Sequence, residues 1–456
     1  MRVMLVAHRF PPDGVAGVER ITQSLADELA SRGDEVSVFA RQPGGEMLLP
    51  PTFATEQLPN GVRLYRSMGG GEARLDRFLA HAKHLENQFT LALTETMPDV
   101  VHILHLLGLS PMFLDVIRRM RIAIAVSMQD FFYACPLILL RKRSGEPCDG
   151  PDAGRECVRT CFSHEPASMA LRWNHRSTYF RHLLGYANRV ICPSRYIFNF
   201  FEKLGLDASR VRLIDNAVTI DSIHPLDIQQ SHPAQRGCLK LAFLGTISPH
   251  KGAHVILNAL RHARLGPVEL RLIGARGQVP YATRLREEAK DIPDLRMRFY
   301  GAYEPRDLPV LLDDVDLAIT PSIWPETFAI VVREALVRGV PIAVSRRGGL
   351  PEAVKEGENG FTFDPDHPSE LTGILRRILS EPELLPRLRR GACASRVMKI
   401  AEHADAVRTV YQEAIDDLFA GGTVSLGDVQ QVSFLHNVLL GSGFGAEGVK
   451  GKVAHG

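Results

Sequence analysis

The chain has 456 residues, 45% of them hydrophobic and 23% charged, and these proportions exclude a disordered or fibrous protein. At roughly 150 residues per domain, the length predicts two large domains. No run approaches the roughly 18 apolar residues of a membrane span, and the opening residues lack a signal-peptide cleavage pattern, so we expect a cytoplasmic protein.

The charges are unevenly distributed along the chain. The formal net charge is +2, but residues 118–212 contain 16 Lys or Arg and eight Asp or Glu, which leaves +8 there and −6 elsewhere. A basic run at residues 141–143 belongs to this stretch. The excess indicates an anionic partner, such as a phosphorylated acceptor or an anionic membrane surface. A solvated surface with scattered arginines is the alternative.

The first half of the chain alternates short apolar runs with amphipathic segments. After the first run comes a loop rich in Pro and Gly, and apolar residues then recur at helical spacing from Val18 to Leu29. Continuous apolar runs are typical of buried parallel strands. We predict such strands at residues 2–7, 35–40, 100–104, 122–126, 189–192 and 211–214.

A polar, proline-containing stretch at residues 221–237 interrupts this pattern and predicts a linker. The alternation then resumes and predicts a second parallel sheet. Its strands are expected at residues 239–244, 269–273, 296–300, 316–320 and 341–345. A long helical stretch at residues 397–418 has no strand after it, and we expect it to cross back to the first domain.

The predicted fold class is therefore α/β, with two Rossmann-like domains facing across a cleft, where an active site is expected. We place the first domain at residues 1–220 and the second at residues 238–396. The crossing helix occupies residues 397–418, and a tail of unknown role occupies residues 419–456. The first domain carries a cysteine-containing insert at about residues 135–165.

Four of the seven cysteines lie in or beside this insert, at Cys135, Cys148, Cys157 and Cys161. A metal could bridge the last two, which are separated by three residues, but the wider gaps match no zinc signature well. The cluster is a candidate structural metal site or redox pair. Plain buried thiols are the alternative.

Two glutamates, Glu326 and Glu334, stand eight residues apart where a predicted strand leads through a Pro-broken loop into a helix near Phe328. The free amides at the helix start, expected at Ala329, Ile330 and Val331, suit a pyrophosphate. A carboxylate beside them would bind sugar or ribose hydroxyls. Acids favoured by the helix dipole are the alternative interpretation of the pair.

Two further loops follow strands of the second sheet. Gly245 ends one strand, and Lys251 stands just before the next helix, where a lysine supplies a point charge for phosphate. Gly348 and Gly349 lie at another turn from strand to helix, where missing side chains let the backbone approach a ligand closely. Three such loops at one edge of a sheet indicate a binding site.

These motifs resemble the GT4 group of retaining glycosyltransferases, which have the GT-B fold, along nearly the full chain. The family's EX7E motif corresponds to Glu326 and Glu334, its phosphate-binding lysine to Lys251 and its Gly-Gly-x-Pro-Glu turn to residues 348–352. The resemblance implies that Glu326 contacts the donor sugar, Glu334 the ribose and Lys251 the diphosphate. It implies a donor site of Gly17, Gly245, Thr246, Lys251, Glu326, Phe328, Ala329, Ile330, Val331, Glu334, Gly348 and Gly349.

On the acceptor side, two segments of the first domain resemble the family and contribute His105, Gln129 and Asp130. Where many members carry His before this Asp, the chain has Gln129, which cannot exchange a proton. Thr246 likewise replaces a frequent arginine of the phosphate loop. Both departures bear on rate and acceptor chemistry more than on fold.

The resemblance implies a hexosyl transfer from a nucleotide diphosphate sugar, with retention of configuration, to a glycan, lipid-linked or other anionic acceptor. Catalytic roles are expected for Glu326, Lys251 and His105, with no cofactor and no catalytic metal, because Lys251 and helix amides stabilise the leaving group. We expect no nucleic-acid partner. Two alternatives are another GT-B enzyme, such as a nucleotide-sugar epimerase or a phosphorylase, and a catalytically weak sugar-nucleotide-binding subunit.

Overall fold

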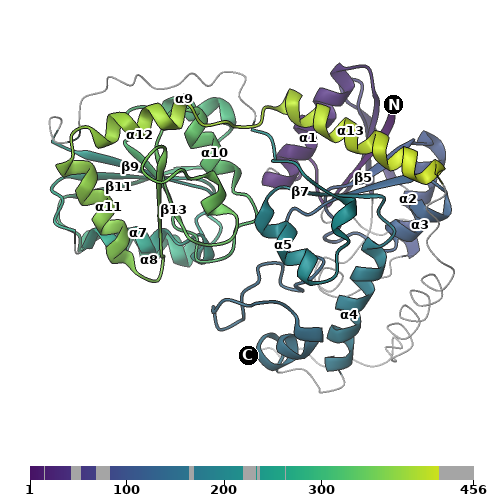
Figure 1. Cartoon of the computed structure of the whole chain (residues 1–456), viewed down its shortest axis with the longest axis horizontal. Coiled ribbons are helices and arrows are strands. Elements are labelled where there is room, and N and C mark those ends of the chain that lie inside the picture. The colour runs from purple at the N-terminus through teal and green to yellow at the C-terminus, as the bar shows by residue number, and fades with distance from the viewer. Residues whose placement is uncertain are drawn as a thin grey trace, which may run out of the picture.

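The computed structural model describes residues 1–14, 16–42, 53–67, 83–163, 169–218, 233, 237–261 and 263–420. They form two lobes, each built on one sheet with helices on its faces (Figure 1). The predicted linker at residues 221–237 lies almost wholly outside the described residues, as does the tail beyond residue 420. No helix in the described part of the chain is long and apolar enough to cross a membrane.

The first lobe contains an eight-stranded sheet in the order β3-β4-β2-β1-β5-β6-β7-β8, in which only β3 runs antiparallel to its neighbour. The central strands are buried on both faces, as their apolar sequences require. The strands are β1 (Arg2–Ala7), β2 (Glu35–Arg41), β3 (Phe53–Gln57), β4 (Arg63–Ser67), β5 (Val100–Ile103), β6 (Ala123–Ser127), β7 (Arg189–Cys192) and β8 (Val211–Leu213). The helices are α1 (Gly17–Ser31), α2 (Lys83–Thr96), α3 (Phe113–Arg119), α4 (Met169–Leu184) and α5 (Arg195–Lys203).

The six strands predicted in this half are confirmed to within one or two residues, but β3 and β4 were not predicted. Strand β3 lies at the sheet edge with four of its five residues exposed, so its sequence is polar and carries no apolar run. Edge strands need no burial on both faces, and a search for buried strands misses them.

The second lobe contains a six-stranded parallel sheet in the order β11-β10-β9-β12-β13-β14. Its strands are β9 (Leu239–Leu244), β10 (Val268–Ile273), β11 (Leu295–Gly301), β12 (Leu317–Thr320), β13 (Ile342–Ser345) and β14 (Gly360–Phe363). Its helices are α7 (Ala253–Arg261), α8 (Val279–Lys290), α9 (Leu308–Leu311), α10 (Ile330–Val337), α11 (Pro368–Ser380) and α12 (Leu384–Cys393). The five predicted strands are confirmed, and the four-residue edge strand β14 is an addition.

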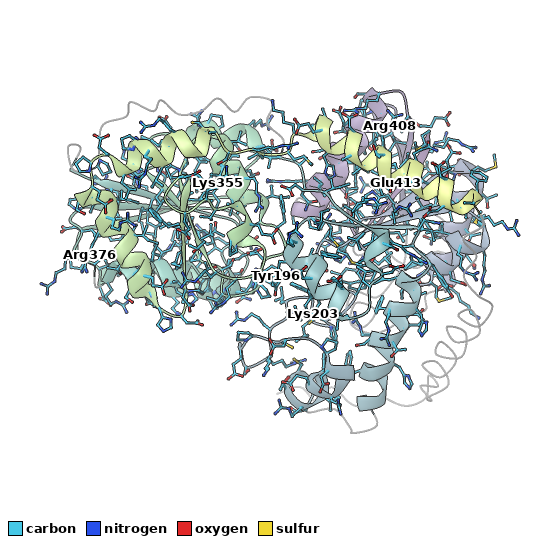
Figure 2. All side chains as sticks on the ribbon, in the orientation of Figure 1. Tyr196, Lys203, Lys355, Arg376, Arg408 and Glu413 are labelled. Atoms are coloured by element: carbon cyan, nitrogen blue, oxygen red, sulfur yellow. The ribbon has the colours of Figure 1, made fainter. Side chains whose placement is uncertain are left out.

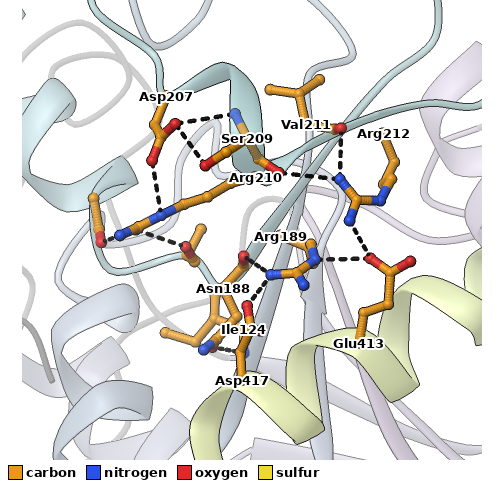
Figure 3. A network of polar contacts seen from close by, with 12 residues as sticks. Ile124, Asn188, Arg189, Asp207, Ser209, Arg210, Val211, Arg212, Glu413 and Asp417 are labelled. Carbon is orange, nitrogen blue, oxygen red and sulfur yellow. Dashed lines mark hydrogen bonds and ion pairs between the residues drawn. The ribbon is translucent and has the colours of Figure 1, made fainter. Parts of the chain in front are cut away.

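Helix α13 (Ile400–Phe419) lies over the first lobe, as predicted for the crossing helix, although it begins three residues later (Figure 1). Arg408 and Glu413 lie along it (Figure 2). Arg189 and Arg212 of the first sheet converge on Glu413, at 2.8 and 2.7 Å (Figure 3). The apolar face of α13 completes the core of the first lobe through Ala404, Val407, Val410, Tyr411 and Ala414.

Direct hydrogen bonds join the two lobes. The carboxylate of Glu352 accepts the backbone amides of Arg195 and Tyr196, at 2.9 and 2.7 Å, at the first turn of α5. Tyr196 lies at the boundary between the lobes (Figure 2). The hydroxyl of Ser194 donates to the carbonyl of Thr327 at 2.6 Å. A carboxylate from one domain therefore caps a helix of the other, and these contacts set the two walls of the cleft.

Candidate active site

A cavity of about 460 Å³ lies between the two domains. Its volume is in the range of small-molecule sites. Most of the residues predicted for the site line it, but His105, Gly348 and Gly349 are not among the lining residues. The predicted residues that line the cavity are Gly17, Gln129, Asp130, Gly245, Thr246, Lys251, Glu326, Phe328, Ala329, Ile330, Val331 and Glu334.

Helix α10 begins at the cavity, two residues later than expected from the sequence. Ala329 precedes the helix with a left-handed backbone, φ 59°, and Ile330 is the first helical residue. The amides of Ile330 and Val331 belong to the first turn, where no partner exists within the helix, and both residues line the cavity. The geometry of this end of α10 is therefore suited to an anion.

Lys251 and Glu326 come together at the same edge of the second sheet. The Lys251 ammonium lies 2.7 Å from a Glu326 carboxylate oxygen, which also accepts the hydroxyl of Ser322. Gly252 permits this approach, because at its φ of 78° a Cβ atom would lie 2.0 Å from the carbonyl oxygen of Pro321. Although burial opposes ionisation, Lys251 holds the pKa of Glu326 below its ordinary value.

Glu334 is buried and is held by residues that the sequence analysis missed. The hydroxyl of Tyr303 donates to its carboxylate at 2.6 Å, and the guanidinium of Arg20, from the first domain, lies 3.7 Å away. Arg20 also donates to the carbonyl of Tyr303. Burial raises the pKa of Glu334, and these two partners only partly oppose it. Arg20 lies beside Gly17 in the sequence, but its partner is on the other domain, so no local pattern could reveal the contact.

Gly17, Gly245 and Thr246 complete the donor-side residues on the cavity surface. A Cβ atom on Gly17 would lie 3.7 Å from the side chain of Ile330, so the start of α1 faces the start of α10 across the cleft. Gly245 follows β9 with φ 124°. The side chain of Thr246 carries no charge, so Lys251 supplies the positive charge of the second-domain wall among the lining residues.

Gly348 and Gly349 pack against the loop of Glu326. At φ 63°, a Cβ atom on Gly348 would lie 2.1 Å from the carbonyl oxygen of Glu326, and the amide of Gly349 donates to that oxygen at 2.7 Å. Close approach of backbone to backbone explains both glycines. They hold the backbone of Glu326 in place, and their close approach to a ligand stays a prediction.

Of the residues predicted for the acceptor side, Gln129 and Asp130 line the first-domain wall, and His105 contacts Asp130. His105 bonds Asp130 at 2.8 Å, and Gln129 exchanges two hydrogen bonds with the amide of Asn216, at 2.9 and 3.3 Å. Thr327 of the second domain donates to the backbone carbonyl of Gln129 at 2.8 Å. At the position where the family often has a histidine, the side-chain amide of Gln129 thus links the first-domain wall to the loop of Asn216.

His8 and Glu19 also line this wall, and the sequence analysis did not single them out. His8 follows β1 and lies 3.2 Å from Glu19, in the first turn of α1. The ring of His8 contacts that of His105, with 4.7 Å between centroids. Their positions after a strand and at a helix start were the available signal, because polar residues at the carboxyl ends of parallel strands meet at one edge.

The four clustered cysteines gather around one small cavity of about 10 Å³, room for about one water-sized sphere. All four are unpaired, and burial raises the pKa of Cys157 to about 12. No group of three or more Cys, His, Asp or Glu within the described ranges could hold a metal ion. The described geometry favours buried thiols, and a structural metal there stays a prediction.

The basic run at residues 141–143 is largely engaged within the chain. Arg141 donates to the carbonyl of Gly145 at 2.8 Å, and Lys142 lies 3.1 Å from Glu156. Arg143 lies over the ring of Phe162, 5.5 Å from its centroid. These contacts hold the three side chains in place, and only Lys142 is paired with a carboxylate, so Arg141 and Arg143 keep their positive charge at this surface.

Known proteins match both halves of the chain. The family profile described as Glycosyltransferase Family 4 matches residues 15–222, and that described as Glycosyl transferases group 1 matches residues 227–393. Together the two matches support a GT4-type glycosyltransferase. Its two sheets and crossing helix make the GT-B fold, as the resemblance implied.

Individual relatives agree with this assignment. Glycogen synthase of Mycobacterium tuberculosis is 26% identical over 411 residues, which cover 86% of this chain and 89% of that protein. D-inositol 3-phosphate glycosyltransferase of Corynebacterium efficiens is 30% identical over 189 residues, 40% of this chain and 44% of that protein. Among solved structures, HepE of Anabaena in complex with UDP and glucose has a TM-score of 0.62 at 19% identity, covering 90% of this chain and 99% of that one.

Proposed function

We propose that this glycosyltransferase moves a sugar from a nucleotide diphosphate donor to an acceptor hydroxyl with retention of anomeric configuration. The observation that carries the proposal is the Lys251 and Glu326 pair, at 2.7 Å, beside the start of α10 in a cavity between two domains. The domains, proposed at residues 1–220 and 238–396, supply the acceptor and donor walls.

The proposed donor site has a cation and a helix start for the diphosphate. Breaking the bond between sugar and phosphate builds negative charge on the departing diphosphate. Lys251 and the amides of Ile330 and Val331, which line the cavity, would stabilise that charge, so the reaction as proposed needs no catalytic metal. Lys251 would then share its ammonium between the phosphate and Glu326.

Glu326 and Glu334 are proposed to bind the two sugars of the donor. The ionised carboxylate of Glu326 lies beside the start of α10 and would accept the hydroxyls of the transferred sugar. Glu334 lies on the side of α10 that faces the first domain, where it is bonded to Tyr303 and lies near Arg20. Its carboxyl group would accept the ribose hydroxyls. A neutral carboxyl, favoured by burial, can still both donate and accept there.

The acceptor is proposed to enter along the first domain, past His105, Gln129 and Asp130. A glycan or lipid-linked acceptor with an anionic group would use the residual basic surface of residues 118–212 for a peripheral, cytoplasmic contact with a membrane. Catalysis is assigned to Glu326 and Lys251. His105 is assigned to positioning, because both of its ring nitrogens are bonded within the wall.

A panel of UDP-, GDP- and ADP-sugars tests the proposal. A donor at 100 times its dissociation constant adds about 2.7 kcal/mol to the unfolding free energy and should raise the melting temperature. The stabilising donor is then tested for nucleotide release, and the anomeric configuration of the product is read by NMR. Glu326→Gln serves as the matched control, because we expect this variant to keep the fold and to lose turnover.

The same panel separates the alternatives. Isomerised donor without nucleotide release would indicate an epimerase, and a melting shift with unchanged donor would indicate a binding subunit. An inverted product would contradict retention while leaving the donor assignment intact. Absence of any melting shift across the panel would contradict the proposed donor site.

A further inference from the structure

Each polar group of the predicted acceptor-side residues already has at least one hydrogen-bond partner within the protein. His105 accepts the amide of Leu107 on Nδ1 at 3.0 Å, so its Nε2 carries the proton that bonds Asp130 at 2.8 Å. The other oxygen of Asp130 accepts the amide of Phe132 at 2.7 Å. With the amide of Gln129 also bonded, these residues form a supporting layer.

His8 and Glu19 differ, because each leaves one polar atom open. Nε2 of His8 lies 3.2 Å from Oε1 of Glu19, whereas Nδ1 of His8 and Oε2 of Glu19 are buried and have no hydrogen-bond partner among the described residues. Glu19 is 3% exposed, and both residues line the cavity. Buried polar atoms in native proteins are almost always bonded, so this pair of open atoms points to a ligand.

Both open atoms are hydrogen-bond acceptors. Burial lowers the pKa of His8, which keeps its imidazole neutral. Although burial works against ionisation of Glu19 as well, its bond to His8 contributes to a pKa below the ordinary value. A neutral His8 that donates from Nε2 to an ionised Glu19 leaves a lone pair on Nδ1. The dipole of α1 accounts for an acid in its first turn, but not for a buried oxygen without a partner.

We propose that His8 and Glu19 bind hydroxyl groups at the reacting end of the acceptor, and this rests on the proposed transferase function. Two adjacent hydrogen-bond acceptors match two hydroxyl donors, as on a sugar or another polyol. The carboxylates of Glu19 and Asp130 on this wall disfavour a phosphate at the same place. The reacting end is therefore a neutral polyol, and an anionic group of the acceptor lies elsewhere.

The supporting layer gives His8 its orientation. The ring of His105 contacts that of His8, and Asp130 in turn holds His105. Thus His105 and Asp130 act as positioning residues through His8. If His105 itself met the acceptor, substitution of His8 should affect acceptor use less than substitution of His105. We expect the His8 substitution to have a direct effect.

Two substitutions of His8 separate the two ring nitrogens. In His8→Asn the side-chain oxygen can replace Nδ1, and in His8→Gln the side-chain nitrogen can replace Nε2 and keep the bond to Glu19. The stabilising donor from the nucleotide-sugar panel is used, with water and then glycerol as hydroxyl probes. Nucleotide release, the glycerol concentration at half-saturation and the donor-induced melting shift are measured for wild type, both His8 variants and Glu19→Gln.

We expect His8→Gln and Glu19→Gln to lower nucleotide release about tenfold and to weaken glycerol use, and His8→Asn to stay within about threefold of wild type. The donor-induced melting shift should be unchanged in all three. If both His8→Gln and Glu19→Gln released nucleotide at the wild-type rate, this inference would be overturned while the proposed transferase function would stand. Loss of the donor shift would instead assign the pair to the donor site and also overturn it. Wild type that neither shifts nor releases nucleotide would reject the proposed function.

Discussion

Replacement of Lys251 by Met should reveal how strongly this lysine supports the buried charge of Glu326. Removing one partner of a buried ion pair costs roughly 3–5 kcal/mol, because an uncompensated charge remains. The Lys251 side chain is 26% exposed and Ser322 also bonds Glu326, so we expect the lower value of about 2–3 kcal/mol. The melting temperature should fall on the order of 5 °C or more, and turnover about a hundredfold.

A double-mutant cycle identifies the cause of this loss. Glu326→Gln removes the charge, so Lys251→Met should cost far less stability in that background. Lys290→Met is the control, because Lys290 lies 2.6 Å from Glu287 but both side chains are largely exposed, and it should change the melting temperature little. Additive losses, or a Lys251→Met variant as stable as the control, would refute the reasoning. Full activity in both Lys251→Met and Glu326→Gln would show that the site assignment is wrong.

Four further outcomes are expected. EDTA should leave turnover largely unchanged. Loss of turnover in EDTA, with recovery when Mn²⁺ or Mg²⁺ is added, would contradict this. Glu334→Gln should raise the donor dissociation constant more than it lowers the turnover number, which steady-state kinetics at varied donor will show. Reversing residues 141–143 to Glu should weaken acceptor use or anionic-liposome binding at low salt without altering donor affinity. Burial lowers the pKa of His102 to about 3, so the unfolded chain binds a proton below about pH 6.5 that the folded chain refuses, and stability falls as pH drops. Between pH 7 and pH 5, the unfolding free energy of wild type should fall by about 2 kcal/mol more than that of His102→Gln, which melting temperatures measured at the two pH values will show.

Most of the strands predicted from sequence lie inside the two sheets, although the edge strands β8 and β11 were also predicted. Central strands such as β1 and β9 are apolar on both faces, and parallel order brings their following loops to one edge. Lys251 and Glu326 meet for that reason, although 75 residues separate them. Strand β3 escaped because an edge strand needs less burial and its sequence is polar. Strand β14 is largely buried, but it has only four residues and begins with a glycine, so it offers no apolar run.

Contacts across the cleft could not be predicted, because they depend on how the two domains are placed. Arg20 meets Glu334, and Glu352 caps α5, only when the lobes stand in this relative position. The glycines show a different limit. A Gly-Gly turn after a strand indicates close approach, but the sequence does not say whether the neighbour is a ligand or, as for Gly348, the backbone of Glu326.

Both walls of the cavity carry charges of both signs, and their arrangement bears on which substrate is expected to bind where. The second-domain wall presents Lys251 and the start of α10, which we propose for a diphosphate, together with Glu326 and Glu334. The first-domain wall presents Glu19 and Asp130, whose pKa values are both held below their ordinary values. Arg20 of the same wall is engaged with Glu334 and Tyr303 of the second domain. A phosphate placed against Glu19 and Asp130 would therefore meet two carboxylates, and this part of the first-domain wall is negative. Since the proposed acceptor meets this negative part of the wall, a neutral hydroxyl is favoured at the reacting carbon. Any negative charge on the acceptor must then lie beyond the cavity, toward the basic residues of the first domain.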